Sequence, residues 1–196
     1  MDSAPRRLVV SEYLSLDGVM EDPMWTVPYW SDEIAAYKRD ELFASDALLL
    51  GRVTFEAFAE VWPTRPDEDP YAARINALPK HVATTTLAPD EVDQAGWNGH
   101  RLGDDVEAAI RALKGDAGGD LLVFGSATLV RSLVRAGLVD EYRLLVYPVV
   151  LGEGKRLFEG EQASLELVDA RSFDTGVTAL TYRPVREGAG DPAAMG

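Results

Sequence analysis

ALLLGRVTFEAF, at residues Ala47–Phe58, combines a strand, a glycine and the beginning of a helix in one short stretch. Its apolar run, Ala47–Leu50, is typical of a strand that is buried on both faces. Beyond Gly51, a helix is indicated by aromatic residues at helical spacing, namely Phe55, Phe58 and Trp62. A helix leaves its first backbone N–H groups without intrahelical acceptors and directs the positive end of its dipole to the same place. The junction therefore predicts an anion site.

Two side chains at the start of this helix suit an anion. Arg52 presents a fork of donors that matches phosphate geometry, and Thr54 offers a hydroxyl that can cap the helix. We interpret Gly51, Arg52 and Thr54 as a cradle for a nucleotide phosphate. The alternative is an ordinary strand-to-helix turn with a surface arginine, because such turns are common in α/β proteins.

The same pattern occurs a second time. The apolar run Leu121–Phe124 is followed by Gly125-Ser126-Ala127 and by a predicted helix over Thr128–Ala136. Small residues at this turn let a ligand approach the backbone, and the N–H groups of the helix point at it. The three-glycine fingerprint of a standard Rossmann domain is absent, which disfavours that fold.

Composition excludes several classes of function. The chain has 196 residues and a net charge of −14, which argues against nucleic-acid or anionic-membrane partners. It has no cysteine and only two histidines, which excludes a thiolate zinc site, a cysteine nucleophile and a histidine-rich metal site. We expect no metal. No signal peptide or membrane span is recognisable, so we expect a cytoplasmic protein.

The remaining pattern predicts one α/β domain over residues 1–186, followed by a flexible tail over 187–196. A first strand, Leu8–Leu16, ends at the turn Asp17-Gly18, and a long strand, Glu141–Val150, contains Pro148. Strands alternate with helices early in the chain. Leu165–Ala170 and Val177–Arg183 then form a terminal antiparallel pair.

An apolar loop, Val19–Trp30, contains two prolines, two methionines and two tryptophans, Trp25 and Trp30. It is either a lid over a pocket or a plug over the core. The acids that flank it are Asp17, Asp32 and Glu33. An acid beside an apolar lid can have a raised pKa and serve as a proton donor, whereas the alternative is a turn aspartate and two acids in a helix's first turn.

Thr85 and Thr86 end a predicted strand, Lys80–Thr86. Their hydroxyls could face a ligand at the carboxyl end of that strand. The alternative is that these β-branched residues simply fill the strand.

Five motifs carry a resemblance to a known family. They are SLDG (Ser15–Gly18), LLLGRVTFE (Leu48–Glu56), VFGSATL (Val123–Leu129), VDEY (Val139–Tyr142) and PVVLGEGKRLF (Pro148–Phe158). In this order they resemble the reductase domain of the bifunctional riboflavin-biosynthesis deaminase/reductase. They also resemble the small stand-alone proteins grouped with that domain under the dihydrofolate-reductase fold. The resemblance spans about Arg7 to Arg183, and the last motif is the most specific.

The resemblance implies a dihydrofolate-reductase-like three-layer α/β/α fold. Its sheet would be mixed and mostly parallel, with about eight strands and an antiparallel C-terminal strand. The implied cofactor is NADPH. Gly51, Arg52 and Thr54 would bind near its adenosine-side phosphates, and Thr85 and Thr86 near the ribose 2′-phosphate. The turn under the pyrophosphate would be Gly125, Ser126, Ala127, Thr128 and Leu129.

The resemblance also implies a substrate side. Asp17 and Gly18 would lie beside the nicotinamide and the substrate. Glu33 matches the helix position where dihydrofolate reductases place their substrate-binding acid, and Asp32 is the neighbouring candidate. The residues that would line the substrate are Trp25, Trp30, Tyr147, Pro148 and Leu151.

We therefore expect an NADPH-dependent reductase that transfers hydride to a C=N or C=O carbon of a small heterocyclic substrate. Asp17 or Glu33 would be the catalytic acid that steers protonation. The alternative is a non-catalytic dimeric module of the same fold that binds a nucleotide, which the scarcity of proton-transfer groups favours. The resemblance to this family also implies a homodimer.

Overall fold

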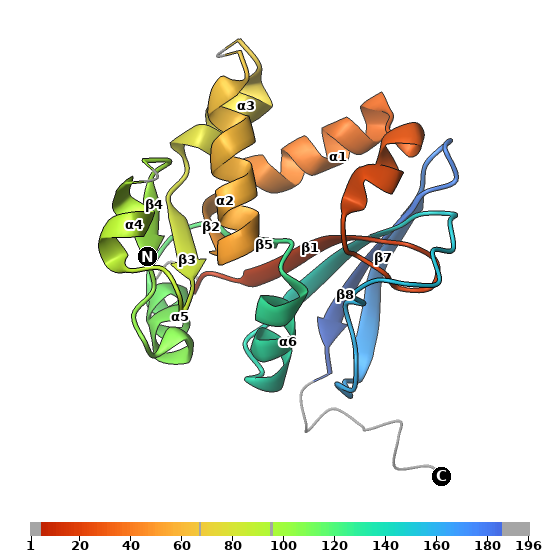
Figure 1. The fold of residues 1–196 in the computed structure, drawn as a ribbon. Helices are drawn as coiled ribbons and strands as arrows, with labels where there is room; N and C mark the ends of the chain where they lie inside the picture. The colour runs from red at the N-terminus through yellow and green to blue at the C-terminus, as the bar shows by residue number, and fades with distance from the viewer. Residues whose placement is uncertain (1–4, 67, 95, 186–196) are drawn as a thin grey trace.

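The computed structural model describes residues 5–66, 68–94 and 96–185 (Figure 1). The tail predicted over residues 187–196 lies outside these residues. One eight-stranded sheet runs through the molecule in the order β4-β3-β2-β5-β1-β6-β8-β7. Its strands, in chain order, are β1 (Leu8–Leu14), β2 (Ser45–Gly51), β3 (Lys80–Ala83), β4 (Gly99–Arg101), β5 (Asp120–Phe124), β6 (Glu141–Val146), β7 (Leu165–Ser172) and β8 (Thr178–Pro184).

The sheet is mixed, as the sequence predicted. All neighbouring pairs from β4 to β6 are parallel, while β8 is antiparallel to both β6 and β7. Because the parallel strands share one direction, the turns that follow β1, β2, β3, β5 and β6 all lie at the same edge of the sheet. This carboxyl edge carries the residues predicted to bind a ligand.

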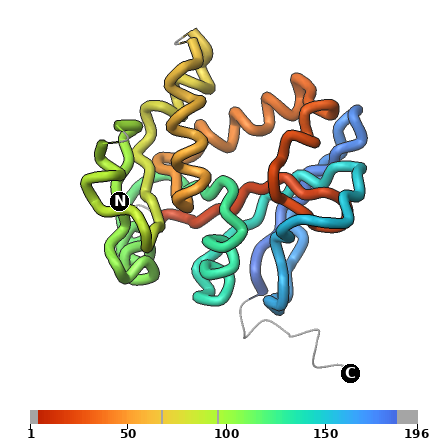
Figure 2. Tube along the Cα trace, in the orientation of Figure 1, coloured from red at the N-terminus to blue at the C-terminus, as the bar shows by residue number. Residues whose placement is uncertain are grey.

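Helices cover both faces of the sheet, which gives the predicted three layers (Figures 1 and 2). They are α1 (Asp32–Phe43), α2 (Arg52–Val61), α3 (Pro70–Ala77), α4 (Pro89–Gln94), α5 (Val106–Gly115) and α6 (Ala127–Arg135). Helices α1 to α4 pack on one face, and α5 and α6 on the other. None of the helices within the described residues is long and apolar enough to cross a lipid bilayer.

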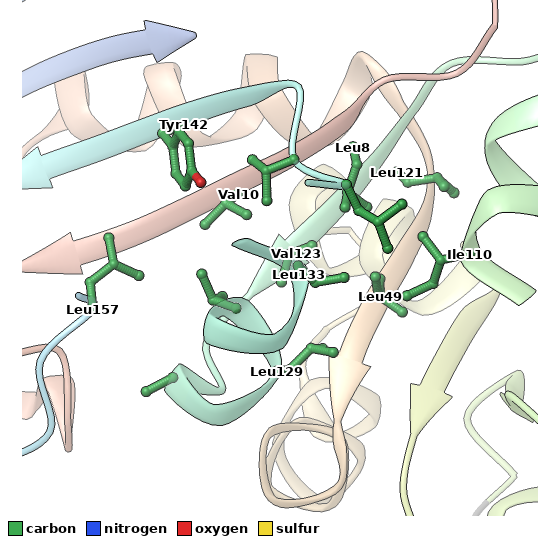
Figure 3. Packing of buried hydrophobic residues seen from close by; sticks show 14 of the residues in the cluster. Leu8, Val10, Leu49, Ile110, Leu121, Val123, Leu129, Leu133, Tyr142 and Leu157 are labelled. Atoms are coloured by element: carbon green, nitrogen blue, oxygen red, sulfur yellow. The ribbon is translucent and has the colours of Figure 1, made fainter. Parts of the chain in front are cut away.

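Successive side chains of a strand point to opposite faces of the sheet, so each buried strand contributes residues to the hydrophobic cluster on either face. In β2, Leu49 faces α5 and α6, whereas Leu48 and Leu50 face α2 and α3. Figure 3 shows the first of these clusters, in which Leu129 and Leu133 of α6 lie against Val123 of β5. The continuous apolar runs in the sequence therefore mark strands with helices on both sides.

Some element boundaries differ from those predicted. The strand predicted over Glu141–Val150 ends at Val146, because Pro148 cannot donate to the ladder. The loop Val19–Trp30 contains a 3₁₀-helix over Pro23–Tyr29. The short helix α4 and the three-residue edge strand β4 have too little pattern to be recognised from sequence.

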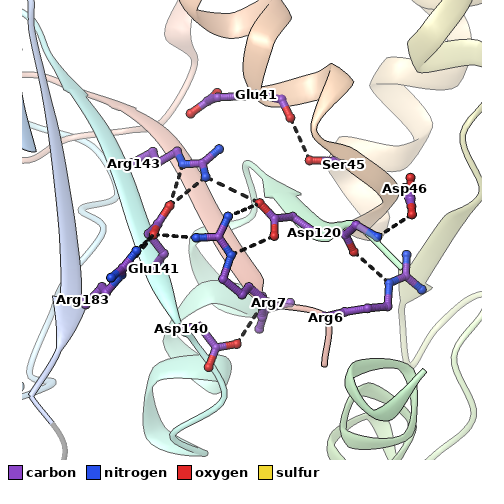
Figure 4. A network of polar contacts seen from close by, with 12 residues as sticks. Arg6, Arg7, Glu41, Ser45, Asp46, Asp120, Asp140, Glu141, Arg143 and Arg183 are labelled. Atoms are coloured by element: carbon purple, nitrogen blue, oxygen red, sulfur yellow. Dashed lines mark hydrogen bonds and ion pairs between the residues drawn. The ribbon is translucent and has the colours of Figure 1, made fainter. Parts of the chain in front are cut away.

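A network of ion pairs closes the opposite, amino-terminal end of the sheet (Figure 4). Glu141 of β6 is buried and accepts hydrogen bonds from Arg7, Arg143 and Arg183. Arg7 also binds Asp120 of β5 through two hydrogen bonds. Burial alone would raise the pKa of Glu141, but the hydrogen bonds and charges of these arginines outweigh it and hold the pKa below its usual value.

Candidate functional site

The two strand–glycine–helix junctions lie against each other. Strands β2 and β5 are hydrogen-bonded neighbours, with Leu49 opposite Val123. A Cβ atom placed on Gly51 would lie 2.0 Å from Ser126 Oγ, and one on Gly125 would lie 2.9 Å from Thr54 Oγ1. Helices α2 and α6 then leave on opposite faces of the sheet. Adjacent strand ends whose helices diverge in this way are where open α/β sheets bind ligands.

Both of these helices begin without a side-chain cap. Gly51 is the N-cap of α2 and Ser126 is the N-cap of α6, and neither supplies a capping hydrogen bond. In contrast, α1, α3 and α5 are capped by the side chains of Ser31, Asp69 and Asp105. The predicted capping by Thr54 is wrong, because Thr54 is the third residue of α2. Its side chain is directed toward Gly125. Two helix N-termini thus meet at one point with their first N–H groups uncapped.

The backbone of the second turn is in an uncommon conformation. Gly125 has a φ of 62°, and Ser126 has a φ of 66° and a ψ of 71°. A left-handed conformation at a residue with a side chain costs free energy and persists only where the surroundings enforce it. In this conformation Ser126 Oγ occupies the space left by Gly51, so the two turns are in close contact.

Arg52 stands at the start of α2, about half exposed, and its Nη1 lies 2.8 Å from Glu56 Oε2 one turn along the helix. The strand β3 ends at Ala83, so Thr85 and Thr86 lie in the exposed turn that follows it. That turn is held by Thr84, whose Oγ1 accepts from the backbone N–H of Thr86 and Leu87. Sequence reasoning missed Thr84, which is buried.

Asp17 does not have the raised pKa that the sequence suggested. Its carboxylate accepts hydrogen bonds from Ser15 Oγ at 2.7 Å, from the N–H of Leu151 at 3.1 Å and from that of Gly152 at 2.8 Å. The Ser15 hydroxyl and then these backbone donors lower the pKa of Asp17 to about 2. Asp17 is therefore ionised at neutral pH and organises the loop after β6, so it has no proton to donate.

Glu33 lies apart from the two turns. Its exposed carboxylate forms an ion pair with Arg171 of β7 at 3.4 Å. Because β7 is the last strand of the sheet, this contact directs Glu33 away from the ends of β2 and β5. Asp32 is likewise exposed, in the first turn of α1. The buried face of α1 begins one residue later, at Ile34.

The aromatic loop is packed down on the end of β6. Tyr147 is fully buried, and its ring makes edge-on contacts with Tyr13, Trp25 and Tyr29 at centroid distances of 5.4 to 5.9 Å. Tyr147 therefore anchors the loop, and its role in lining the substrate stays a prediction. Trp30 is 48% exposed and contacts Tyr13.

The other predicted substrate residues lie at the same edge of the sheet. Gly18 has a φ of 82° in the turn after β1, and no atom lies within 4 Å of where its Cβ would be. Pro148 is exposed, whereas Leu151 is half-buried and donates its N–H to Asp17. Trp25 is half-buried.

A buried cluster of charged residues was missed by sequence reasoning. Lys38 of α1 lies 2.6 Å from Glu41 Oε2 and 2.5 Å from Ser11 Oγ, with its ammonium group 4.6 Å from the centroid of the Phe124 ring. Glu12, the next residue of β1, is buried on the other face of the sheet. A signal was present, because Glu12 interrupts an apolar strand and Lys38 lies one helical turn from Ile34 and from Leu42.

Two cavities among the described residues lie elsewhere. One, of about 740 Å³, adjoins the segment before β6 and is lined by residues such as Arg111, Lys114 and Gly137. The other, of about 400 Å³, adjoins the ion-pair network of Figure 4. Neither is lined by a predicted site residue. In the described parts of the chain, no cluster of three or more histidine, cysteine, aspartate or glutamate residues could hold a metal ion.

Comparison with known proteins places these features in a family. The profile of the RibD C-terminal domain matches residues 6–179. The uncharacterized protein YyaP of Bacillus subtilis (strain 168) is 30% identical over 182 residues, which cover 90% of this chain and 94% of YyaP. The uncharacterized protein YwjB of the same organism is 26% identical over 179 residues, covering 88% of this chain and 95% of YwjB.

Solved structures share the fold at low sequence identity. A putative riboflavin biosynthesis protein from Shewanella sp. PV-4 is 19% identical, with a TM-score of 0.64 over 92% of this chain and 99% of its own. A pyrimidine reductase-like protein from Corynebacterium diphtheriae is 12% identical, with a TM-score of 0.64 over 93% of each chain. RibD from Acinetobacter baumannii is 18% identical, with a TM-score of 0.61 over 92% of this chain, which spans 58% of that longer protein.

The contact between the two turns can be tested by substitution. Gly51→Ala is expected to lower the free energy of unfolding by about 1–3 kcal/mol, because its Cβ would overlap Ser126. Ser126→Gly removes the obstructing atoms and suits the left-handed backbone, so the double variant is expected to recover most of this loss. Urea denaturation of the two single variants and the double variant measures the coupling.

Gly103→Ala is the matched control, because no atom lies within 4 Å of its Cβ position. If Gly51→Ala loses no more stability than this control, or if the effects of the two single variants simply add, the turns are not in contact.

Proposed function

The chain belongs to the RibD C-terminal domain family, and on that premise we propose that it is an NADPH-dependent reductase. Hydride would pass to a C=N or C=O carbon of a small heterocyclic compound, and the neighbouring N or O atom would take up a proton. One observation carries the proposal: two uncapped helix N-termini meet at the ends of adjacent parallel strands. Fold-level support comes from solved structures named as a riboflavin biosynthesis protein and a pyrimidine reductase-like protein.

The residues at the two turns fit a dinucleotide. The first-turn N–H groups of α2 and α6 suit the phosphates, and the chain supplies no acidic residue in the first turn of either helix. A contact between Arg52 and the 2′-phosphate is supported by its position as the first residue of α2 and by its half-exposed side chain. The exposed turn at Thr85 and Thr86 adds hydroxyl donors at the end of β3, the strand next to β2.

In this proposal the protein itself binds NADPH and the substrate, orients them and encloses them. NADPH, when bound, supplies the hydride. Asp17 fixes the loop after β6 through the N–H groups of Leu151 and Gly152, and the aromatic loop is fixed on Tyr147. Holding two reactants in register and excluding water accounts for much of the rate of such a transfer. Since Asp17 is ionised and Glu33 pairs with Arg171 of β7, neither residue is proposed to supply the proton.

A second candidate, a binding module without turnover, is favoured by the state of Asp17. The lowered pKa of Asp17 removes from proton transfer the acid that the resemblance puts beside the nicotinamide. The homodimer and the cytoplasmic location expected from the sequence stay predictions.

The test is a fluorescence titration with NADPH, followed by assays of NADPH oxidation with pterin, ribosylaminopyrimidine and quinone-like acceptors. We expect saturable NADPH binding and oxidation dependent on one of these acceptors. Saturable binding with no oxidation by any acceptor would favour the binding module. Absence of binding would contradict both candidates.

Arg52→Ala tests the assignment of the 2′-phosphate. We expect the dissociation constant for NADPH to rise about tenfold or more, because a charge-assisted hydrogen bond is lost, while that for NADH changes little. Arg111→Ala is the matched control, since Arg111 on α5 also pairs with a glutamate one turn away. Equal weakening of NADPH and NADH binding would remove Arg52 from this role.

A further inference from the structure

Glu12 is a buried acid that nothing in the proposed mechanism uses. It lies in β1 directly beyond the point where Ser11 pairs with Phe124, the last residue of β5. Its Oε2 accepts the backbone N–H of Gly125 at 3.2 Å. Its Oε1 is buried and has no hydrogen-bond partner among the described residues. A buried polar atom left without a partner is costly, so it calls for an explanation.

The side chain of Glu12 lies on the α6 side of the sheet. Ser11 binds Lys38 and Glu41 of α1 on one face, so by alternation Glu12 faces the opposite side, with Val10 and Leu14. Val10 and Leu14 pack with Leu129 in the first turn of α6. The carboxyl group of Glu12 therefore sits beside the uncapped N-terminus of α6, at the turn that we propose lies under the pyrophosphate.

Burial determines the charge state of this acid. It raises the pKa of Glu12 to about 8, assisted by the negative charge of Glu41 and opposed by Lys38 and the N–H of Gly125. Lys38 and Glu41 act from α1 across the sheet, while the first turn of α6 carries no acidic residue. At pH 7 the group is predominantly a neutral carboxylic acid.

We propose that Glu12 is a positioning residue for the dinucleotide, in which one carboxyl oxygen holds the Gly125 turn and the acid proton on the other is donated to the anionic group that caps α6. This inference rests on the proposed function, because it takes the capping group to be a phosphate of NADPH. The ligand phosphate supplies the acceptor that the protein does not. Loss of the proton from Glu12 replaces this hydrogen bond with repulsion between two negative groups.

A dependence of affinity on pH follows from this arrangement. Only the neutral form of Glu12 accommodates the ligand, so the dissociation constant for NADPH is expected to be flat near pH 7. Above pH 8 it should rise roughly tenfold per pH unit. Phosphate groups titrate near pH 6, so the ligand's own charge is constant over this range.

The test is NADPH binding by fluorescence between pH 7 and about 9.5 for the wild-type chain, Glu12→Gln and Glu12→Ala. The glutamine amide keeps both a donor and an acceptor but does not titrate, so Glu12→Gln is expected to bind NADPH with an affinity independent of pH. Glu12→Ala is expected to bind weakly at every pH, because the acceptor for Gly125 and the ligand donor are both lost. Glu107→Gln, an exposed acid on α5, is the charge-matched control and should keep the wild-type profile.

The role of Glu12 can also be tested on the wild-type chain alone, in case a variant fails to fold. Since the ligand requires the neutral acid, calorimetry near pH 9 in buffers of different ionisation enthalpy should show the uptake of close to one proton per NADPH bound. A flat wild-type profile without proton uptake, or a Glu12→Gln profile as steep as that of the wild type, would overturn the role of Glu12. Either result would leave the proposed function standing. No NADPH binding at any pH would instead overturn the proposed function and this inference together.

Discussion

The close approach of Gly51 to Ser126 is the constraint on which the rest of the site depends. No larger side chain fits at Gly51, because Ser126 Oγ would lie 2.0 Å from its Cβ. The approach follows from the parallel pairing of β2 with β5, whose helices leave on opposite faces of the sheet. Two positive helix ends therefore converge while the helix bodies diverge, and the chain supplies no capping side chain at either end. An anionic ligand is the natural partner for such a pair of ends.

Much of this arrangement could be predicted from the sequence, because it depends on local patterns. The apolar runs at β2 and β5 mark strands buried on both faces, and the glycine after each run marks the turn. The antiparallel pair at the end of the chain was also predicted, as two short strand segments joined through a turn at residues 172–176. The strands that carry the two turns were recognised correctly, but their adjacency in the sheet was fixed only by pairing between residues far apart in sequence.

The charge states could not be predicted, since they depend on burial and on long-range partners. Asp17 beside an apolar loop suggested a raised pKa, yet backbone donors more than 130 residues away help to lower it. Glu33 matched a family position, but its partner is an arginine on the far edge strand. The acid that does have a raised pKa is Glu12, beside Ser11 in an otherwise apolar strand. The interruption of the apolar run marks its position, but its charge state depends on burial and on partners that the sequence does not show.

Backbone amide NMR of the full chain, recorded while NADPH is added, tests most directly whether the two helix ends bind one ligand. The account predicts that the largest shifts occur together in the first turns of α2 and α6, at Arg52–Thr54 and at Ala127–Leu129. It would be contradicted if those amides stayed unchanged while the shifts clustered around the cavity of about 740 Å³ beside Arg111 and Lys114.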